Sequence, residues 1–138
     1  MTRFLLDSTF CMACLRRKSW ALQALGHVQL LSVAISSITV GELWLGTYLA
    51  EAPGREAARV ESFLRPIQVI PFGREEASQW AKLDANLRKQ GNRIETEDAI
   101  IAATAMASAM TLVTGNAKHF GRVRGLKTVD WELQPPPA

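Results

Sequence analysis

The sequence predicts an α/β fold, a single domain whose parallel sheet of about four or five strands is flanked by helices on both faces. The chain of 138 residues has the length of one ordinary domain, and 48% hydrophobic residues are enough for a core. Short apolar, β-branched segments alternate along it with longer segments of helical spacing. This alternation is typical of a parallel sheet, where functional residues gather beyond the C-terminal ends of the strands.

Five short apolar segments are the strand candidates, and the segments between them have helical spacing. The predicted strands are residues 3–6, 31–36, 67–72, 111–114 and 126–129. The predicted helices cover about residues 9–17, 20–28, 38–52, 55–64, 75–89 and 97–108, with a short helical turn at 117–120. We expect N-caps at Ser8 or Thr9, at Ser37 and at Thr96, because a hydroxyl there can accept from free helix amides.

The sequence composition predicts the limits of the folded domain and the cellular compartment of the protein. We expect residues 1–133 to form the folded domain and residues 134–138, which include three consecutive prolines, to be a frayed tail. No apolar run reaches the roughly 18 residues that span a bilayer, and the N-terminus lacks the pattern of a signal peptide. We therefore expect a cytoplasmic protein with no membrane partner.

The charge is mildly basic, with a formal net charge of +3 and a pI near 9.2. The basic residues form three clusters: 16–18, then Arg88, Lys89 and Arg93, and finally Lys118, Arg122, Arg124 and Lys127. Clusters of this kind can contact phosphates or can simply be solvated surface, and both interpretations stay open.

Cys11 and Cys14 have a C-x-x-C spacing, which is found in zinc and redox sites. A zinc site needs two more ligands, and the chain has no other cysteine and only two isolated histidines. The flanking residues have the apolar character of a buried helix face. We therefore interpret both cysteines as small buried hydrophobic residues.

Three acidic residues lie where the predicted fold gathers functional groups. Asp7 directly follows the first strand, Glu42 lies on the helix after the second, and Asp98 lies in the first turn of a very apolar helix. Any one of them can be explained by helix capping or by the helix dipole. Taken together they predict a shared site, because like charges at one sheet edge repel unless a cation relieves them.

Carboxylate clusters bind hard divalent cations such as Mg²⁺ or Mn²⁺. A metal held this way can activate water and stabilise phosphoryl charge, so phosphodiester hydrolysis is the reaction that we expect. Ser8, Thr114 and Asn116 place further polar groups near the same edge, although each also suits a cap or a turn. Gly46, one turn after Glu42, leaves room beside that carboxylate.

Four segments, in order, resemble the motifs of PIN-domain ribonucleases. They are Leu5-Leu6-Asp7-Ser8, residues 35–43 with Gly46, residues 98–105, and residues 112–116 followed by Phe120, Gly125-Leu126 and Trp131. The small size and the Ile-Ala-Ala form of the third motif are similar to the VapC branch, the toxins of type II toxin–antitoxin pairs. The resemblance covers nearly the whole chain.

The resemblance implies an Mg²⁺- or Mn²⁺-dependent endoribonuclease that acts on RNA, forms a homodimer and is inhibited by a small antitoxin inserting a segment near the acids. It implies that Asp7 and Asp98 are metal ligands and that Glu42 completes the catalytic set. The chain departs from the family at His119, where another acid is common. An imidazole there can weaken a second metal site, contact RNA phosphate, or lie in a surface turn.

Two other classes compete with this interpretation. The His119 departure raises the alternative of a catalytically weakened PIN-like domain that acts as an RNA- or protein-binding module, against which the three intact acids count. A nucleotide-binding α/β domain needs a glycine-rich loop after the first strand, and residues 7–12 contain no glycine.

Overall fold

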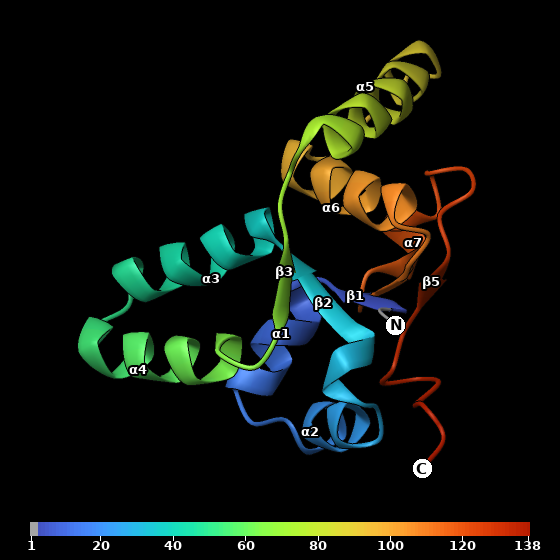
Figure 1. Ribbon diagram of the computed structural model, residues 1–138. Helices are drawn as coiled ribbons and strands as arrows, with labels where there is room; N and C mark the ends of the chain where they lie inside the picture. The colour runs from blue at the N-terminus through green and yellow to red at the C-terminus, as the bar shows by residue number, and fades with distance from the viewer. Residues whose placement is uncertain (1–2) are drawn as a thin grey trace.

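A computed structural model describes residues 3–138 as a five-stranded parallel sheet with helices on both faces (Figure 1). The strand order is β3-β2-β1-β4-β5, and every pairing is parallel. The strands are β1 (Phe4–Leu6), β2 (Val33–Ser36), β3 (Gln68–Ile70), β4 (Thr111–Val113) and β5 (Thr128–Val129). The predicted fold class is confirmed, and each strand is shorter than the apolar segment that predicted it.

The helices divide into two layers around the sheet. They are α1 (Ser8–Leu15), α2 (Ser19–Gly26), α3 (Ser37–Leu49), α4 (Pro53–Leu64), α5 (Arg74–Lys89), α6 (Thr96–Ala107) and α7 (Ala117–Phe120), and a 3₁₀ turn covers Leu30–Ser32. Helices α1 to α4 supply one core cluster, and α5 to α7 supply the other. Figure 1 shows α3 beside α4 on one side of the sheet and α5 beside α6 on the other.

Successive strand side chains enter opposite cores, as the period of two requires. Leu5 and Leu112 pack with α5 and α6, whereas Leu6 and Val113 pack with α1 to α4. All four are essentially inaccessible to solvent. This two-sided burial explains why the strands are continuous apolar runs rather than alternating ones.

All three predicted N-caps are wrong, because each observed cap lies one or two residues earlier in the chain. Asp7, not Ser8 or Thr9, caps α1 by accepting from the Phe10 N–H at 2.9 Å. Ser36, not Ser37, caps α3, and its hydroxyl accepts from the Thr39 N–H. In both cases the cap is the last residue in extended conformation, because only there does a short side chain reach back over the free amides. Helix α6 begins at Thr96 itself, after Glu95, without a side-chain cap.

Helix α6 is buried almost all round, as its composition predicts, with Ala99 and residues 101–105 inaccessible. Cys11 and Cys14 are free thiols buried among α1 and its neighbours, which agrees with their interpretation as core residues. Burial raises the pKa of Cys14 to about 11, and it raises that of Cys11 well above its ordinary value. Between residues 3 and 138, no helix combines the length and the apolar character that crossing a membrane requires.

Candidate active site

Asp7, Glu42 and Asp98 come from three separate elements that meet near the carboxyl ends of the central strands. Asp7 follows β1, which lies between β2 and β4 in the sheet. Glu42 lies on α3, which leaves the end of β2, and Asp98 lies in the first turn of α6. Their charges act on one another: Asp98 raises the pKa of Asp7, and both of these acids raise the pKa of Glu42.

Asp7 is the most buried of the three, with 3% of its surface exposed. Its Oδ1 accepts from the Phe10 N–H at 2.9 Å and from the Thr9 hydroxyl at 2.7 Å, and Thr114 is a third partner. Burial outweighs these hydrogen bonds, so the pKa of Asp7 is raised above its ordinary value. A cation bound beside such a buried carboxylate would stabilise its ionised form.

Glu42 is half-buried and is held by Ser8, whose hydroxyl donates to Glu42 Oε1. Desolvation raises the pKa of Glu42, and the Ser8 hydrogen bond opposes that shift. Because Ser8 directly follows Asp7, this contact ties the first strand end to α3. Ser8 therefore lies beside Glu42, and its hydroxyl holds one oxygen of that carboxylate.

Asp98 lies beside His119, the residue that stands where the resemblance expects an acid. His119 Nε2 is 3.0 Å from Asp98 Oδ2, which is a hydrogen bond between α7 and α6. Burial raises the pKa of Asp98, and the charge and the hydrogen bond of His119 lower it. His119 is thus in direct contact with the acidic cluster rather than in a surface turn.

The segment after β4 supports Asp7 through hydroxyl groups. Thr114 is 1% exposed, contacts Asp7 and accepts from the Asn116 N–H at 2.9 Å. Thr9, whose role beside Asp7 the sequence did not reveal, also accepts from the Gly115 N–H at 3.2 Å. Asn116 itself is exposed and engages this network through its backbone, as a turn residue does.

A cavity of about 290 Å³ opens beside Glu42, between α1, α3 and α4. Gly46 lines it one turn after Glu42, and a Cβ at Gly46 would meet nothing within 4 Å. The space that the sequence predicts beside this carboxylate is therefore present.

The donor set suits a hard divalent cation whose shell includes water. Within residues 3–138, no three acidic, histidine or cysteine side chains converge tightly enough to enclose an ion by themselves. Mg²⁺ usually keeps several waters and takes only one or two carboxylates from a protein. Asp7 and Asp98, two interacting carboxylates with raised pKa values, fit that requirement.

Comparisons with known proteins agree on one family. The PIN domain family matches residues 4–126. The tRNA(fMet)-specific endonuclease VapC of Shigella flexneri is 30% identical over 131 residues, which are 95% of this chain and 99% of that protein. Ribonuclease VapC2 of Haemophilus influenzae is also 30% identical, with the same coverage.

Solved structures agree with the sequence relatives. A chain of VapBC2 from Rickettsia felis, bound to a DNA fragment from the promoter, has a TM-score of 0.88 at 26% identity. The match covers 94% of this chain and 99% of that one. DNA-bound VapBC from Salmonella typhimurium has a TM-score of 0.83 at 28% identity, over 95% and 99% of the two chains. The chain belongs to the PIN-domain family, in the branch of the VapC ribonucleases.

Proposed function

We propose that this protein is a metal-dependent endoribonuclease that acts as the toxin of a toxin–antitoxin pair and hydrolyses RNA phosphodiester bonds. The observation that carries the proposal is the convergence of Asp7, Glu42 and Asp98 from three elements. Burial raises the pKa of each, and the charge of Asp98 raises the pKa of Asp7 and of Glu42 further. Such a cluster is unfavourable by itself and favourable around a cation. Relatives of nearly equal length carry the names ribonuclease and endonuclease.

Asp7 and Asp98 would hold the ion, Mg²⁺ or Mn²⁺, and Glu42 would complete the catalytic set. When bound, the metal supplies Lewis-acid stabilisation of phosphoryl charge and lowers the pKa of a coordinated water. The other residues position these acids. Thr9 and Thr114 hold Asp7, Ser8 holds Glu42, and His119 fixes one oxygen of Asp98.

An antitoxin partner is supported by the surface next to Glu42. Leu45, Tyr48 and Leu49 on α3 are 57%, 74% and 77% exposed, and Met12 lines the cavity beside Glu42. Exposed apolar surface of this extent marks a protein interface. A segment of a small antitoxin that covers this face would also block the acidic cluster, and the Salmonella and Rickettsia relatives are VapBC complexes.

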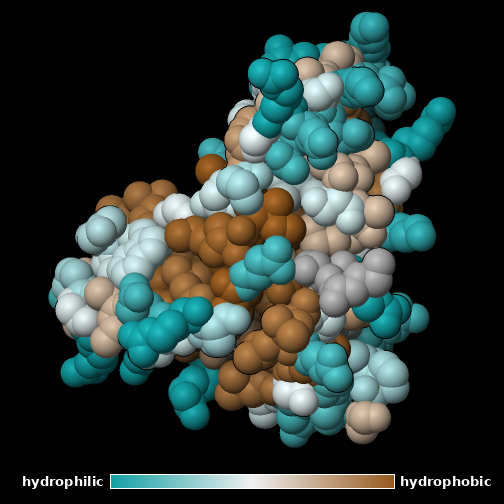
Figure 2. All heavy atoms as spheres, viewed as in Figure 1, coloured by the Kyte–Doolittle hydropathy of each residue, from teal (hydrophilic) through white to brown (hydrophobic). Residues whose placement is uncertain are grey.

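A homodimer is supported by a second apolar area. Figure 2 shows brown, hydrophobic atoms over β3, between the α3–α4 pair and α5. Val69 and Phe72 of this edge are 42% and 39% exposed, which leaves an edge strand uncovered in the single chain. The free, buried thiols suit a reducing compartment, and we place the enzyme in the cytoplasm.

An RNA cleavage assay tests the proposal. We expect the purified protein to cut RNA when Mg²⁺ or Mn²⁺ is added, to stop when EDTA is added, and Asp7→Asn to be inactive. Initiator tRNA, the named target of the Shigella relative, and total RNA are the substrates to use. If neither protein cuts any RNA with either metal, the enzyme is excluded and the weakened, binding-only alternative remains, for which His119 in place of an acid is the specific observation.

A growth assay tests the toxin role separately. Expression of the chain alone is expected to slow bacterial growth, and Asp98→Ala is expected to relieve the effect. Equal toxicity from the variant would show that Asp98 has no part in it.

A further inference from the structure

A second cavity, of about 440 Å³, lies away from the three acids, between α5, the last turn of α6 and the segment after α7. We call it the α5 groove. Its lining includes three cationic side chains, Lys82, Arg122 and Arg124, and three amide side chains, Gln79, Asn86 and Gln90. Among residues 3–138, no carboxylate side chain lines it. A groove with this charge is complementary to a polyanion.

We propose that the α5 groove binds a single-stranded part of the RNA substrate next to the scissile bond; this rests on the proposed ribonuclease function. Arg122 and Arg124 bind backbone phosphates through guanidinium groups, which suit phosphate geometry. Each lining amide offers both a donor and an acceptor, and these can match the exposed edges of unpaired bases.

The floor of the groove favours bases as well as phosphates. Leu83, Leu87 and Val123 line it and are at most 6% exposed, so they form a packed apolar base beneath the polar rim. Figure 2 shows the outer side of α5 covered by hydrophilic side chains. A purely solvated basic face would need neither a concave pocket nor an apolar floor, and the α5 groove has both.

The α5 groove is connected to the acidic cluster through two elements. Met106, which lines the groove, lies roughly two turns after Asp98 on α6, about 12 Å along the helix axis. Helix α7 makes the second link, because His119 contacts Asp98 and Arg122 follows a few residues later. Arg122 Nη1 also donates to the Arg93 carbonyl, 3.2 Å away, just before α6. A short stretch of RNA can therefore occupy both places.

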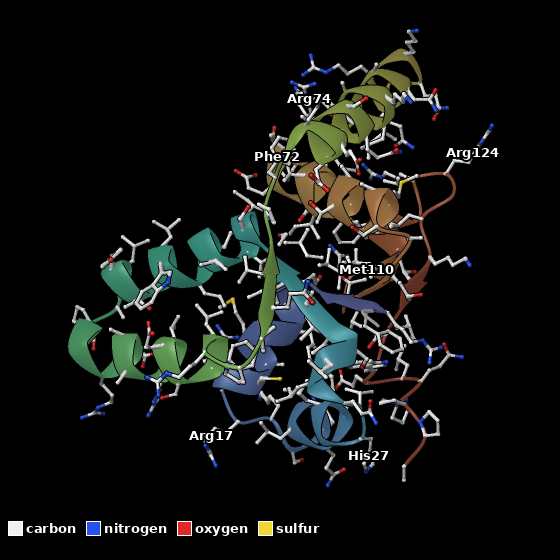
Figure 3. The ribbon with its side chains drawn as sticks, in the orientation of Figure 1. Arg17, His27, Phe72, Arg74, Met110 and Arg124 are labelled. Carbon is white, nitrogen blue, oxygen red and sulfur yellow. The ribbon has the colours of Figure 1, made fainter. Side chains whose placement is uncertain are left out.

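A binding assay tests the α5 groove without requiring cleavage. The probe is a fluorescein-labelled, mixed-sequence RNA of about 20 nucleotides, measured by anisotropy across a salt series in an Asp7→Asn background. We compare the pair Arg122→Gln, Arg124→Gln with the pair Arg17→Gln, Lys18→Gln, which removes the same charge. Arg17 projects from the side of the molecule opposite Arg124 (Figure 3), and both control residues are exposed.

The groove pair is expected to weaken binding about tenfold or more. It should also make the slope of log K against log salt shallower by about 1.4, because each lost single-strand phosphate contact contributes about 0.7. The control pair should change that slope by a small fraction of this amount. An unchanged slope in the groove pair, or an equal change in both pairs, overturns the proposal.

Two further measurements keep the outcomes distinct. If the double groove variant does not unfold cooperatively, the single variant Arg124→Gln replaces it, because that side chain is exposed. Its slope of log K against log salt is expected to be shallower by about 0.7. Cleavage by the unmodified protein is scored separately. If the unmodified protein cleaves RNA and the groove variants bind it as tightly as before, only the proposed role of the α5 groove is refuted. If the unmodified protein does not cleave RNA, the ribonuclease function is refuted, and the binding assay still tests whether the α5 groove binds RNA.

Discussion

The two ends of α6 differ in charge and in how their side chains are held. At its N-terminal end, Asp98 faces His119 and interacts electrostatically with Asp7 and Glu42, and each of these carboxylates accepts a hydrogen bond from the chain. At its C-terminal end, Met106 borders the α5 groove, where Arg122 and Arg124 are exposed. The difference separates two tasks, since chemistry requires acids held in fixed positions and phosphate contacts position the nucleic acid.

The residue that joins the two ends is Phe120, and its loss should have the largest effect. Phe120 ends α7 and is 2% exposed in the core with α5 and α6, between His119 and the groove residues. Phe120→Ala is expected to lower the free energy of unfolding by about 3–5 kcal/mol, the usual cost of such a cavity. Urea denaturation measures this. A loss below about 1 kcal/mol would show that α7 is held by other contacts.

Asp98→Asn should affect catalysis and leave the basic end unchanged. Loss of a group beside a metal ligand costs about 10- to 100-fold in affinity or activity. Asp98→Asn removes a proposed ligand itself, so we expect a loss of about 100-fold or more in the RNA cleavage assay. The matched control is Glu97→Gln, an exposed neighbour in the same helical turn. If Glu97→Gln lost as much activity as Asp98→Asn, the effect would be one of general charge, not of the position of Asp98.

His119→Asp should strengthen metal binding at the acidic end. A second carboxylate beside Asp98, in place of an imidazole at 3.0 Å, adds a hard oxygen donor and a negative charge. We expect Mn²⁺ to bind about tenfold more tightly, since changes next to a metal ligand alter affinity by about 10- to 100-fold. Calorimetric titration measures the affinity, and His119→Asn is the uncharged control. Equal Mn²⁺ affinity in all three proteins would place the ion away from His119.

The smallest expected effect is a change in the thermal stability of the metal-free protein when Asp7 loses its charge. Because the pKa of Asp7 is raised in the folded protein, its ionisation opposes folding above the unfolded value near 3.8. Asp7→Asn, which can still cap α1, is expected to raise Tm in EDTA at neutral pH. The gain should shrink as the pH falls and should vanish below about 3.8, where the carboxyl becomes protonated in both states. A variant that is less stable at neutral pH would show that hydrogen bonds at Asp7 outweigh its burial.

The sequence was sufficient for the fold class and for the placement of the three acids. Period and composition identify buried parallel strands, and Asp7 is adjacent to the strand that positions it. The contacts of those acids were not predictable. The Asp98–His119 and Ser8–Glu42 pairs depend on how α6, α7 and α3 pack, which no local pattern encodes.

The α5 groove and the helix caps were missed for related reasons. Lys82 and Arg122 are far apart in sequence, and they line one cavity only because α5 lies over α6 and the segment after α7. The cap positions depend on which residue is last in extended conformation, a difference of one residue that Ser36-Ser37 does not reveal.

The reactivity of the two buried thiols can measure how often α1 separates from the rest of the protein. Cys11 and Cys14 lie on the buried face of α1, 0% and 4% exposed, and burial raises the pKa of Cys14 to about 11. A thiol reagent therefore reacts with them only when the α1 layer separates from the sheet. Because Asp7 caps this same helix, the labelling rate measures how often the acidic cluster comes apart, and a slower rate on addition of Mn²⁺ or an antitoxin would report binding with no RNA present.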